Sequence, residues 1–301
     1  MIANKVPKGK LVIIGGAEDK GDEYQPEIRN KNKAFEQFEI LKELIPRQNG
    51  QEHSMEIITT ASSEPDEVTR MYRNAFRRIG FDRVDFMHID NDHRNRNPGF
   101  VERVKKAHTV MFAGGDQFRL ATIIGGTDVL EVIKNRYQND ANFVVAGTSA
   151  GAMASSTIMI YEGETNEAIL KGAVKISSGL GIIDRCLIDT HFIKRGRFGR
   201  LAQAVVMNPT CIGIGLGEDT ALIIRKGNIA ECRGSGMVII IDGKKIGHTN
   251  IPFAEEGKPI CIENLRVHIL SKGNCFKLNE RRFVPSKADM RKEKDQELFI
   301  S

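Results

Sequence analysis

The sequence contains no tryptophan, so the aromatic side chains best suited to stacking on a ligand are poorly supplied. Proline is also scarce, with 9 residues against 29 glycines. Glycine without proline is typical of tight turns between strands and helices rather than of flexible linkers. These shortages argue against an aromatic binding platform and against a chain of modules joined by linkers.

Cysteine is scarce as well, with five residues in the chain. Their number is odd and no two of them have CxxC spacing, which argues against a disulfide framework and a structural zinc site. The first residues lack the apolar stretch of a signal peptide, and no apolar run is long enough to span a bilayer. We therefore expect a cytoplasmic protein with no structural metal site and no membrane association.

The chain has 301 residues, of which 41% are hydrophobic and 28% charged. This apolar content is enough for a large core and too high for intrinsic disorder. The formal net charge is +5, but acidic residues are interspersed with the basic ones almost everywhere. A nucleic-acid-binding protein usually concentrates its positive charge on one face, so we expect no nucleic-acid partner and only a modest preference for anionic ligands.

The first half of the chain alternates short apolar runs with segments of helical periodicity. Strands are predicted at 10–14, 55–60, 83–89, 109–113 and 142–146, and helices at 30–44, 65–79, 100–107, 117–124 and 127–138. Strands that are apolar throughout indicate a mostly parallel sheet covered on both faces, as in a three-layer α/β fold.

The pattern changes after residue 155, where glycine-containing turns separate short strands at 186–188, 211–216, 221–225, 229–233 and 237–242. A hairpin or irregular segment is expected at 158–176 and a helix at 198–207. No linker separates the halves. We expect one domain over 1–301, made of a parallel α/β half (10–155), a β-rich C-terminal extension (156–285) and a charged tail (286–301).

The sharpest local motif is Gly147-Thr148-Ser149-Ala150-Gly151, which fits GxSxG and follows a predicted buried strand. Glycines on both sides allow a cramped turn from strand to helix, so that the Ser149 hydroxyl projects from the sheet edge as a nucleophile. The alternative is a phosphate-binding or merely close-packed turn. At another strand end, Gly114-Gly115 lets backbone N–H groups face an oxyanion, and we expect Gly115 and Ala150 to form an oxyanion hole. An ordinary tight turn is the alternative there.

A serine nucleophile needs a general base, and His191 is the candidate because it lies beside a dense charged cluster. The arginines at 195, 197 and 200 suit either a solvated surface or a clamp for carboxylates. Glu218 could orient the imidazole, but Asp219 and Asp189 compete for that role, and Asp189 could instead pair with a cationic substrate group or with one of the arginines. The order serine, histidine, acid differs from that of α/β-hydrolases, which disfavours an ordinary esterase or lipase.

Five segments together resemble the cyanophycinases, serine peptidases related to the α-aspartyl dipeptidase peptidase E. The segments are IGGAEDK at 14–20, FAGGDQ at 112–117, GTSAGA at 147–152, DTHF at 189–192 followed by RGRFGRL at 195–201, and GLGEDTAL at 215–222. They span roughly residues 10 to 245, and their combination is far more specific than GxSxG alone. One departure is Thr190, which is often Gln in the family. The part beyond about residue 245 is less recognisable.

The resemblance implies a flavodoxin-like or class I glutamine amidotransferase-like α/β fold and a homodimer. It also implies a catalytic triad of Ser149, His191 and Glu218, which prefers Glu218 over Asp219. The implied substrate is cyanophycin, a poly-aspartate with arginine on each β-carboxyl, which the family cleaves to β-Asp-Arg without a cofactor. An aspartyl dipeptidase and a non-catalytic ligand-binding relative are the alternatives. The substrate pocket implied by the resemblance consists of Gln117, Asp189, Arg195, Arg197 and Arg200.

Overall fold

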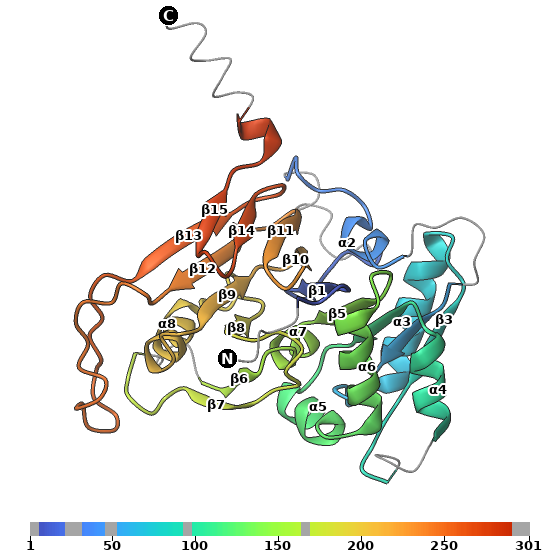
Figure 1. The fold of residues 1–301 in the computed structure, drawn as a ribbon, viewed down its shortest axis with the longest axis horizontal. Helices are drawn as coiled ribbons and strands as arrows, with labels where there is room; N and C mark the ends of the chain where they lie inside the picture. The colour runs from blue at the N-terminus through green and yellow to red at the C-terminus, as the bar shows by residue number, and fades with distance from the viewer. Residues whose placement is uncertain (1–5, 22–31, 46–52, 93–97, 164–168, 291–301) are drawn as a thin grey trace, which may run out of the picture.

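A mixed sheet of nine strands forms the centre of the molecule, in the order β15-β14-β11-β10-β1-β5-β4-β2-β3 (Figure 1). The computed structural model describes residues 6–21, 32–45, 53–92, 98–163 and 169–290. Five neighbouring strands of the sheet are parallel. These are β1 (Lys10–Ile14), β2 (Met55–Ile58), β3 (Val84–Met87), β4 (Thr109–Phe112) and β5 (Val144–Thr148).

The parallel strands are buried on both faces because alternate residues enter two different cores. In β1, Leu11 and Ile13 belong to one apolar cluster, whereas Val12 and Ile14 belong to another. Helices α2 (Glu39–Lys42) and α3 (Pro65–Arg78) cover one face of the sheet. The other face is covered by α4 (Pro98–Lys106), α5 (Gln117–Ile124), α6 (Asp128–Asn139) and α7 (Ala150–Ala154). The apolar strands therefore form an α/β fold, as the sequence predicts.

Strands from the second half of the chain extend the same sheet and build a second one. An antiparallel series joins β1 through β10 (Thr220–Arg225), followed by β11 (Ile229–Gly234), β14 (Cys275–Lys277) and β15 (Arg282–Val284). The large sheet is thus mixed, which corrects the expectation of a mostly parallel one. The second sheet contains β8 (Cys186–Asp189), β9 (Ile212–Leu216), β12 (Val238–Asp242) and β13 (Arg266–Leu270).

The second sheet has its own apolar core. Helix α8 (Phe198–Met207) packs Leu201 and Val205 with Leu187 of β8 and Ile241 of β12. A two-stranded sheet of β6 (Ile158–Glu162) and β7 (Lys175–Ser178) lies next to this core, with Ile160 in it. The expected hairpin at 158–176 is therefore present, and α8 has the predicted bounds.

The helix expected at 30–44 is wrong in the part that the structure describes. Of residues 32–44, only Glu39–Lys42 form a helix. The Asp19 carboxylate accepts a hydrogen bond from the Phe38 N–H at 2.8 Å, and Phe38 has a φ of 57°. This tertiary contact holds the backbone in a left-handed conformation that a continuous helix cannot pass through. Residues 30, 31 and 291–301, which include most of the predicted tail, lie outside the described residues.

Candidate active site

Three glycine turns lie at the carboxyl ends of the adjacent parallel strands β1, β5 and β4. These are Gly15-Gly16, the Gly147–Gly151 motif and Gly114-Gly115. In an open α/β sheet, ligands bind in the crevice beyond the carboxyl ends of the strands. Strand order thus brings together at one edge three motifs that are separated by more than thirty residues in the chain.

Ser149 lies in a strained turn between β5 and α7. Its φ and ψ are 50° and −113°, a conformation that is unusual for a residue with a side chain. The flanking glycines make the turn possible, because a Cβ on Gly147 would lie 2.4 Å from the Gly151 carbonyl oxygen. A Cβ on Gly151 would lie 2.3 Å from the Phe112 carbonyl oxygen. The local geometry is therefore that of a nucleophile elbow.

The Gly15-Gly16 turn ties the large sheet to the second sheet. The Gly15 carbonyl accepts from the His191 N–H at 2.9 Å, and the Gly16 carbonyl accepts from the Asp219 N–H at 3.1 Å. Side chains are excluded here, because a Cβ on Gly16 would lie 2.5 Å from His191 Nε2. These contacts place the residues that follow β8 and β9 directly over the turn that carries Ser149.

Ser149, His191 and Glu218 form an unbroken chain of hydrogen bonds. The distance from Ser149 Oγ to His191 Nε2 is 3.1 Å, and that from His191 Nδ1 to Glu218 Oε1 is 2.7 Å. Lys194 Nζ donates to the other oxygen, Glu218 Oε2, at 3.1 Å. Burial opposes ionisation of Glu218, but the hydrogen bonds from His191 and Lys194 outweigh it and lower the pKa of Glu218. An ionised Glu218 accepts from Nδ1–H, which leaves Nε2 to accept the serine proton.

The two competing acids have other partners. Asp219 accepts from the Ser235 hydroxyl at 2.5 Å and from the Asp19 N–H at 3.1 Å. Burial raises the pKa of Asp219, and the nearby carboxylates act in the same direction. Asp189 is fully buried and pairs with arginines. Sequence spacing alone leaves three acids as candidates to orient the imidazole. Of these three, Glu218 is the one that is hydrogen-bonded to His191.

The arginine cluster after His191 holds an acid of the same chain. Arg200 donates from Nε and Nη2 to the two oxygens of Asp189, both at 2.6 Å. Arg197 donates from Nη1 to Asp189 at 3.1 Å and to the Thr190 carbonyl at 2.8 Å. Burial lowers the pKa of Arg197 to about 10 despite its acidic partner. Asp189 thus pairs with arginines, one of the alternatives that the sequence leaves open.

The other predicted binding residues differ in exposure. Arg195 is exposed and follows His191 by one turn, with its N–H bonded to the His191 carbonyl at 3.0 Å. Gln117 begins α5 and donates to the carbonyls of Ile160 and Tyr161, both at 3.2 Å. Arg195 therefore presents its side chain to solvent near the imidazole, whereas Gln117 links α5 to β6.

Of the two predicted oxyanion donors, Ala150 directly follows Ser149, and Gly115 directly follows Gly114, where a Cβ would lie 3.5 Å from Ser149 Cβ. Ala150 is the first residue of α7, so its N–H has no partner within the helix. Gly115 has a φ of 140°, and a Cβ there would lie 2.1 Å from the Ala61 carbonyl oxygen, so close approach to Ala61 requires glycine. Among the hydrogen bonds of the described residues, neither N–H has an acceptor. Both amides are therefore available to a ligand oxygen.

Sequence reasoning missed a polar group beside Ser149. A cavity of about 150 Å³ between the Gly16 turn and α3 is bordered by Ser149, Glu18, Lys20 and Tyr72. Glu18 is buried and accepts from the Tyr72 hydroxyl, from Thr148 Oγ1 at 2.7 Å and from Lys20 Nζ at 3.1 Å. Although burial alone raises it, these partners bring the pKa of Glu18 down to about 2. The sequence feature that could have identified Glu18 is its position two residues after the Gly15-Gly16 turn, at the carboxyl end of β1.

Two further features bear on the kind of site. Within the described ranges, no group of three or more histidine, cysteine, aspartate or glutamate side chains is arranged to hold a metal ion. Over the same part of the chain, no helix has both the length and the apolar character needed to cross a membrane.

Comparison with known proteins gives consistent matches over most of the chain. The model of peptidase family S51 matches residues 28–232. A cyanophycinase of Synechococcus elongatus is 32% identical over 271 residues, covering 90% of this chain and 80% of that protein. A cyanophycinase of a Nostoc species is 32% identical over 279 residues, covering 93% and 89%.

A solved structure supports the fold independently. The crystal structure of a peptidase from an acI-B1 actinobacterium has a TM-score of 0.61 and 23% identity, and the match covers 91% of this chain and 98% of that one. At this identity the likeness bears on the α/β fold alone. The family match and the curated relatives together establish that the chain belongs to peptidase family S51 and is a serine-type peptidase.

Proposed function

We propose that this peptidase hydrolyses cyanophycin to β-Asp-Arg dipeptides, as an exopeptidase with Ser149, His191 and Glu218 as its triad. The observation that carries the proposal is the hydrogen-bond chain from Ser149 Oγ through the imidazole to the Glu218 carboxylate. The same three groups in this arrangement generate a serine nucleophile in unrelated hydrolases. No metal or organic cofactor takes part in this chemistry.

The reaction proceeds in two half-reactions. Ser149 Oγ attacks the carbonyl carbon while its proton passes to His191 Nε2, and Glu218 stabilises the imidazolium. The amide N–H groups of Gly115 and Ala150 donate to the oxyanion. When the C–N bond breaks, the amine leaves with the proton from His191, and an ester to Ser149 remains. Water then attacks this acyl-enzyme, gives a proton to His191, and the proton returns to Ser149 Oγ.

The substrate class follows from the relatives and from the charges around the triad. The curated relatives above are named cyanophycinase. Exposed Arg195 and half-buried Arg197 lie on the side of His191 and suit aspartyl carboxylates of the substrate. Gln117 is assigned to the same pocket, with its Nε2 bonded to the carbonyls of Ile160 and Tyr161. Asp189 accepts hydrogen bonds from both Arg197 and Arg200 and so holds Arg197 in place. We therefore assign Asp189 and Arg200 a positioning role within the substrate pocket.

The remaining expectations belong to the same proposal. They are the flavodoxin-like and amidotransferase-like classification, a single domain with a β-rich extension, a homodimer and a cytoplasmic location. The absence of a nucleic-acid partner also stays a prediction.

Incubation of the purified protein with cyanophycin, followed by mass identification of the soluble products, tests the proposal. Wild type is expected to release β-Asp-Arg, and Ser149→Ala to lose about 10³-fold or more in turnover while keeping its fold by circular dichroism. Aspartyl dipeptides are supplied in parallel. Cleavage of dipeptides without release from the polymer supports the peptidase E type of activity instead, and wild-type turnover by Ser149→Ala contradicts the triad.

A further inference from the structure

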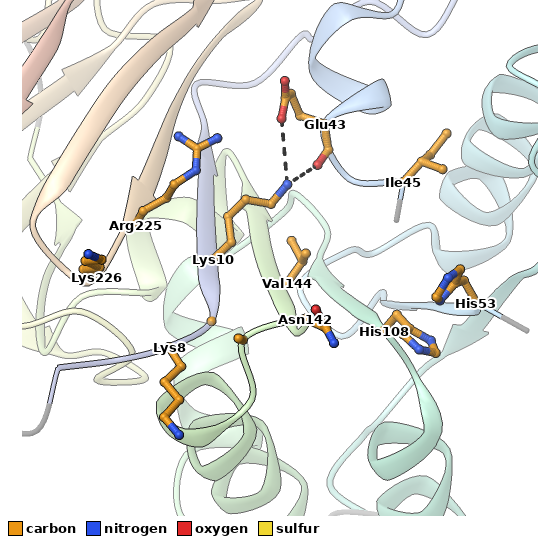
Figure 2. Close-up of a pocket in the computed structure, with 12 residues that line it drawn as sticks. Lys8, Lys10, Glu43, Ile45, His53, His108, Asn142, Val144, Arg225 and Lys226 are labelled. Carbon is orange, nitrogen blue, oxygen red and sulfur yellow. Dashed lines mark hydrogen bonds and ion pairs between the residues drawn. The ribbon is translucent and has the colours of Figure 1, made fainter. Parts of the chain in front are cut away.

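A second and larger cavity lies at the end of the sheet opposite to Ser149. Its volume is about 440 Å³, and it is formed where β1 and β5 begin and β10 ends. Val144, at the start of β5, borders this cavity. Ser149 lies five residues further along the chain, which is about 17 Å at the usual rise of a strand. Figure 2 shows its basic and imidazole side chains, which are Arg225, Lys226, Lys8, Lys10, His108 and His53.

Positive charge exceeds negative charge around this cavity. Glu43 is the one acidic side chain among the described residues that line it, and Lys10 Nζ contacts both the Glu43 carboxylate, at 3.8 Å, and its carbonyl, at 2.6 Å. Arg225 pairs with Glu231 at 3.0 Å. Lys8 and Lys226 have no ion-pair partner among the described residues. Two lysines therefore border the cavity without a counter-charge from the part of the chain that the structure describes.

These two lysines are carried by backbone segments that are fixed against each other. The N–H of Lys8 donates to the Gln138 carbonyl of α6 at 3.3 Å, and the Gly9 N–H donates to Tyr137 at 2.9 Å. The preceding Pro7 packs on the turn after β10, since its Cγ lies 3.0 Å from the position of a Cβ on Gly227. The backbone segments that carry Lys8 and Lys226 are therefore held in place by hydrogen bonds and by packing against each other.

Lys226 also has a backbone conformation that disfavours lysine. Lys226 and Gly227 have φ values of 55° and 58°, and the Asn228 N–H donates to the Arg225 carbonyl at 3.1 Å. A tight turn whose two central residues both have positive φ normally takes Asn, Asp or Gly at the first of them. A lysine there is strained relative to those residues, and strain of this kind is a reason to look for function.

A buried imidazole nitrogen on the far side of the cavity is unsatisfied. His108 Nδ1 is shielded from solvent and has no hydrogen-bond partner among the described residues. Its ring meets that of His53 edge-on, with centroids 4.2 Å apart. Burial lowers the pKa of His108, so a neutral ring is favoured at neutral pH. His108 and His53 both border the cavity, so the pair of rings forms one of its walls.

We propose that this cavity binds a small molecule with two or more negative charges, carried by carboxylate or phosphate groups, between Lys8 and Lys226. The volume admits a metabolite-sized ligand, and the uncompensated ammonium groups recognise its charge. The imidazole pair and the apolar wall at Ile45 and Val144 bound the less charged part of the ligand. This inference does not depend on the peptidase reaction.

Isothermal titration at low ionic strength tests the site with pyrophosphate and citrate, which separate phosphate from carboxylate recognition, and with acetate as a singly charged control. At least one of the two multivalent anions is expected to bind, and acetate to bind far more weakly. Lys8→Gln combined with Lys226→Asn is expected to weaken binding about tenfold or more, because two charged contacts are lost. Asn is chosen because it accepts the turn conformation of position 226.

The matched control is Lys244→Gln with Lys245→Gln, which removes the same charge from two exposed lysines elsewhere. This control is expected to bind like wild type. Equal weakening in both double variants would mean that net charge alone attracts the anion. Loss of binding in Arg195→Gln with retention in the Lys8 and Lys226 variant would place the anion at the arginine cluster. Either result, or failure of both multivalent anions to bind wild type, overturns the proposal.

Discussion

Gly16 offers the sharpest test of the catalytic geometry, because it is a glycine that contacts the imidazole. A Cβ on Gly16 would lie 2.5 Å from His191 Nε2, which is 0.9 Å short of the 3.4 Å at which ordinary contact begins. In Gly16→Ala the imidazole must therefore move by nearly 1 Å or turn away. Either change breaks the 3.1 Å hydrogen bond to Ser149 Oγ.

The expected loss of activity is large and the expected loss of stability is modest. A displacement of about 1 Å from the reactive geometry costs about 10²-fold in rate, so kcat/KM of Gly16→Ala is expected to fall at least that far. Gly16 has a φ of +91°, and an alanine there adds backbone strain of about 1–2 kcal/mol. Initial rates of dipeptide release measure the first effect and urea denaturation measures the second.

Gly80→Ala separates the two effects. Gly80 has a nearly equal φ of +84°, and no atom lies within 4 Å of a Cβ placed there. This variant is expected to lose the same stability as Gly16→Ala and to keep activity within about twofold of wild type, since nothing near the triad moves. If Gly16→Ala retained more than about a tenth of the activity of Gly80→Ala, the contact between Gly16 and His191 would not control catalysis.

The other predictions concern three charged groups. Glu18→Gln is expected to remove the acid sensitivity that Glu18 confers: its pKa of about 2 lies below the ordinary 4.5, so the ionised form adds about 3 kcal/mol of stability above pH 5 that is lost as pH falls toward 2. Urea denaturation at pH 3, 5 and 7 measures this. Asp189→Asn is expected to cost about 3–5 kcal/mol in urea denaturation, because it leaves the buried Arg200 without its counter-charge. Lys194→Met removes a hydrogen bond that lowers the pKa of Glu218, so the acidic limb of the kcat/KM profile is expected to move to higher pH.

Each of these predictions has a specific contradiction. A Glu18→Gln variant whose stability falls with acid as steeply as that of wild type shows that other groups govern acid unfolding. For Asp189, the control is Lys175→Met, which breaks an exposed ion pair with Glu162 and is expected to cost less than about 1 kcal/mol. Similar costs for the two variants contradict the importance of burial. A pH profile of Lys194→Met that superimposes on wild type shows that the lysine does not act through Glu218.

The strand pattern and the site motifs were accessible to sequence reasoning for a physical reason. Strand β1 and helix α8 have the predicted bounds, because continuous apolar residues or a clear apolar stripe specify them locally. Because ligands bind at the carboxyl ends of parallel strands, the sequence alone places the motifs of Ser149 and Gly115 at strand ends where a ligand could bind. The choice of Glu218 among three acids needed the family resemblance, since neighbouring residues differ little in spacing.

The features that sequence reasoning missed depend on contacts between distant residues. The helix expected at 30–44 is interrupted by the bond from Phe38 to Asp19, which no local pattern encodes. Whether Asp189 meets a substrate or Arg200 depends on the packing of α8 against β8. The cavity between Lys8 and Lys226 joins residues more than two hundred positions apart, and the strain at Lys226 appears only when its φ is known.

The junction of the two sheets at the Gly15-Gly16 turn also determines when, during synthesis, reactivity can arise. Ser149 is encoded well before His191 and Glu218, which follow strands β8 and β9 of the second sheet. A nascent chain that has left the ribosome only as far as β5 carries Ser149 without the base proposed for it. Strand β10, which pairs with β1, is translated later still. With the proposed triad, hydrolytic activity is expected only after about three quarters of the polypeptide has emerged, and shorter products of translation are expected to be inactive.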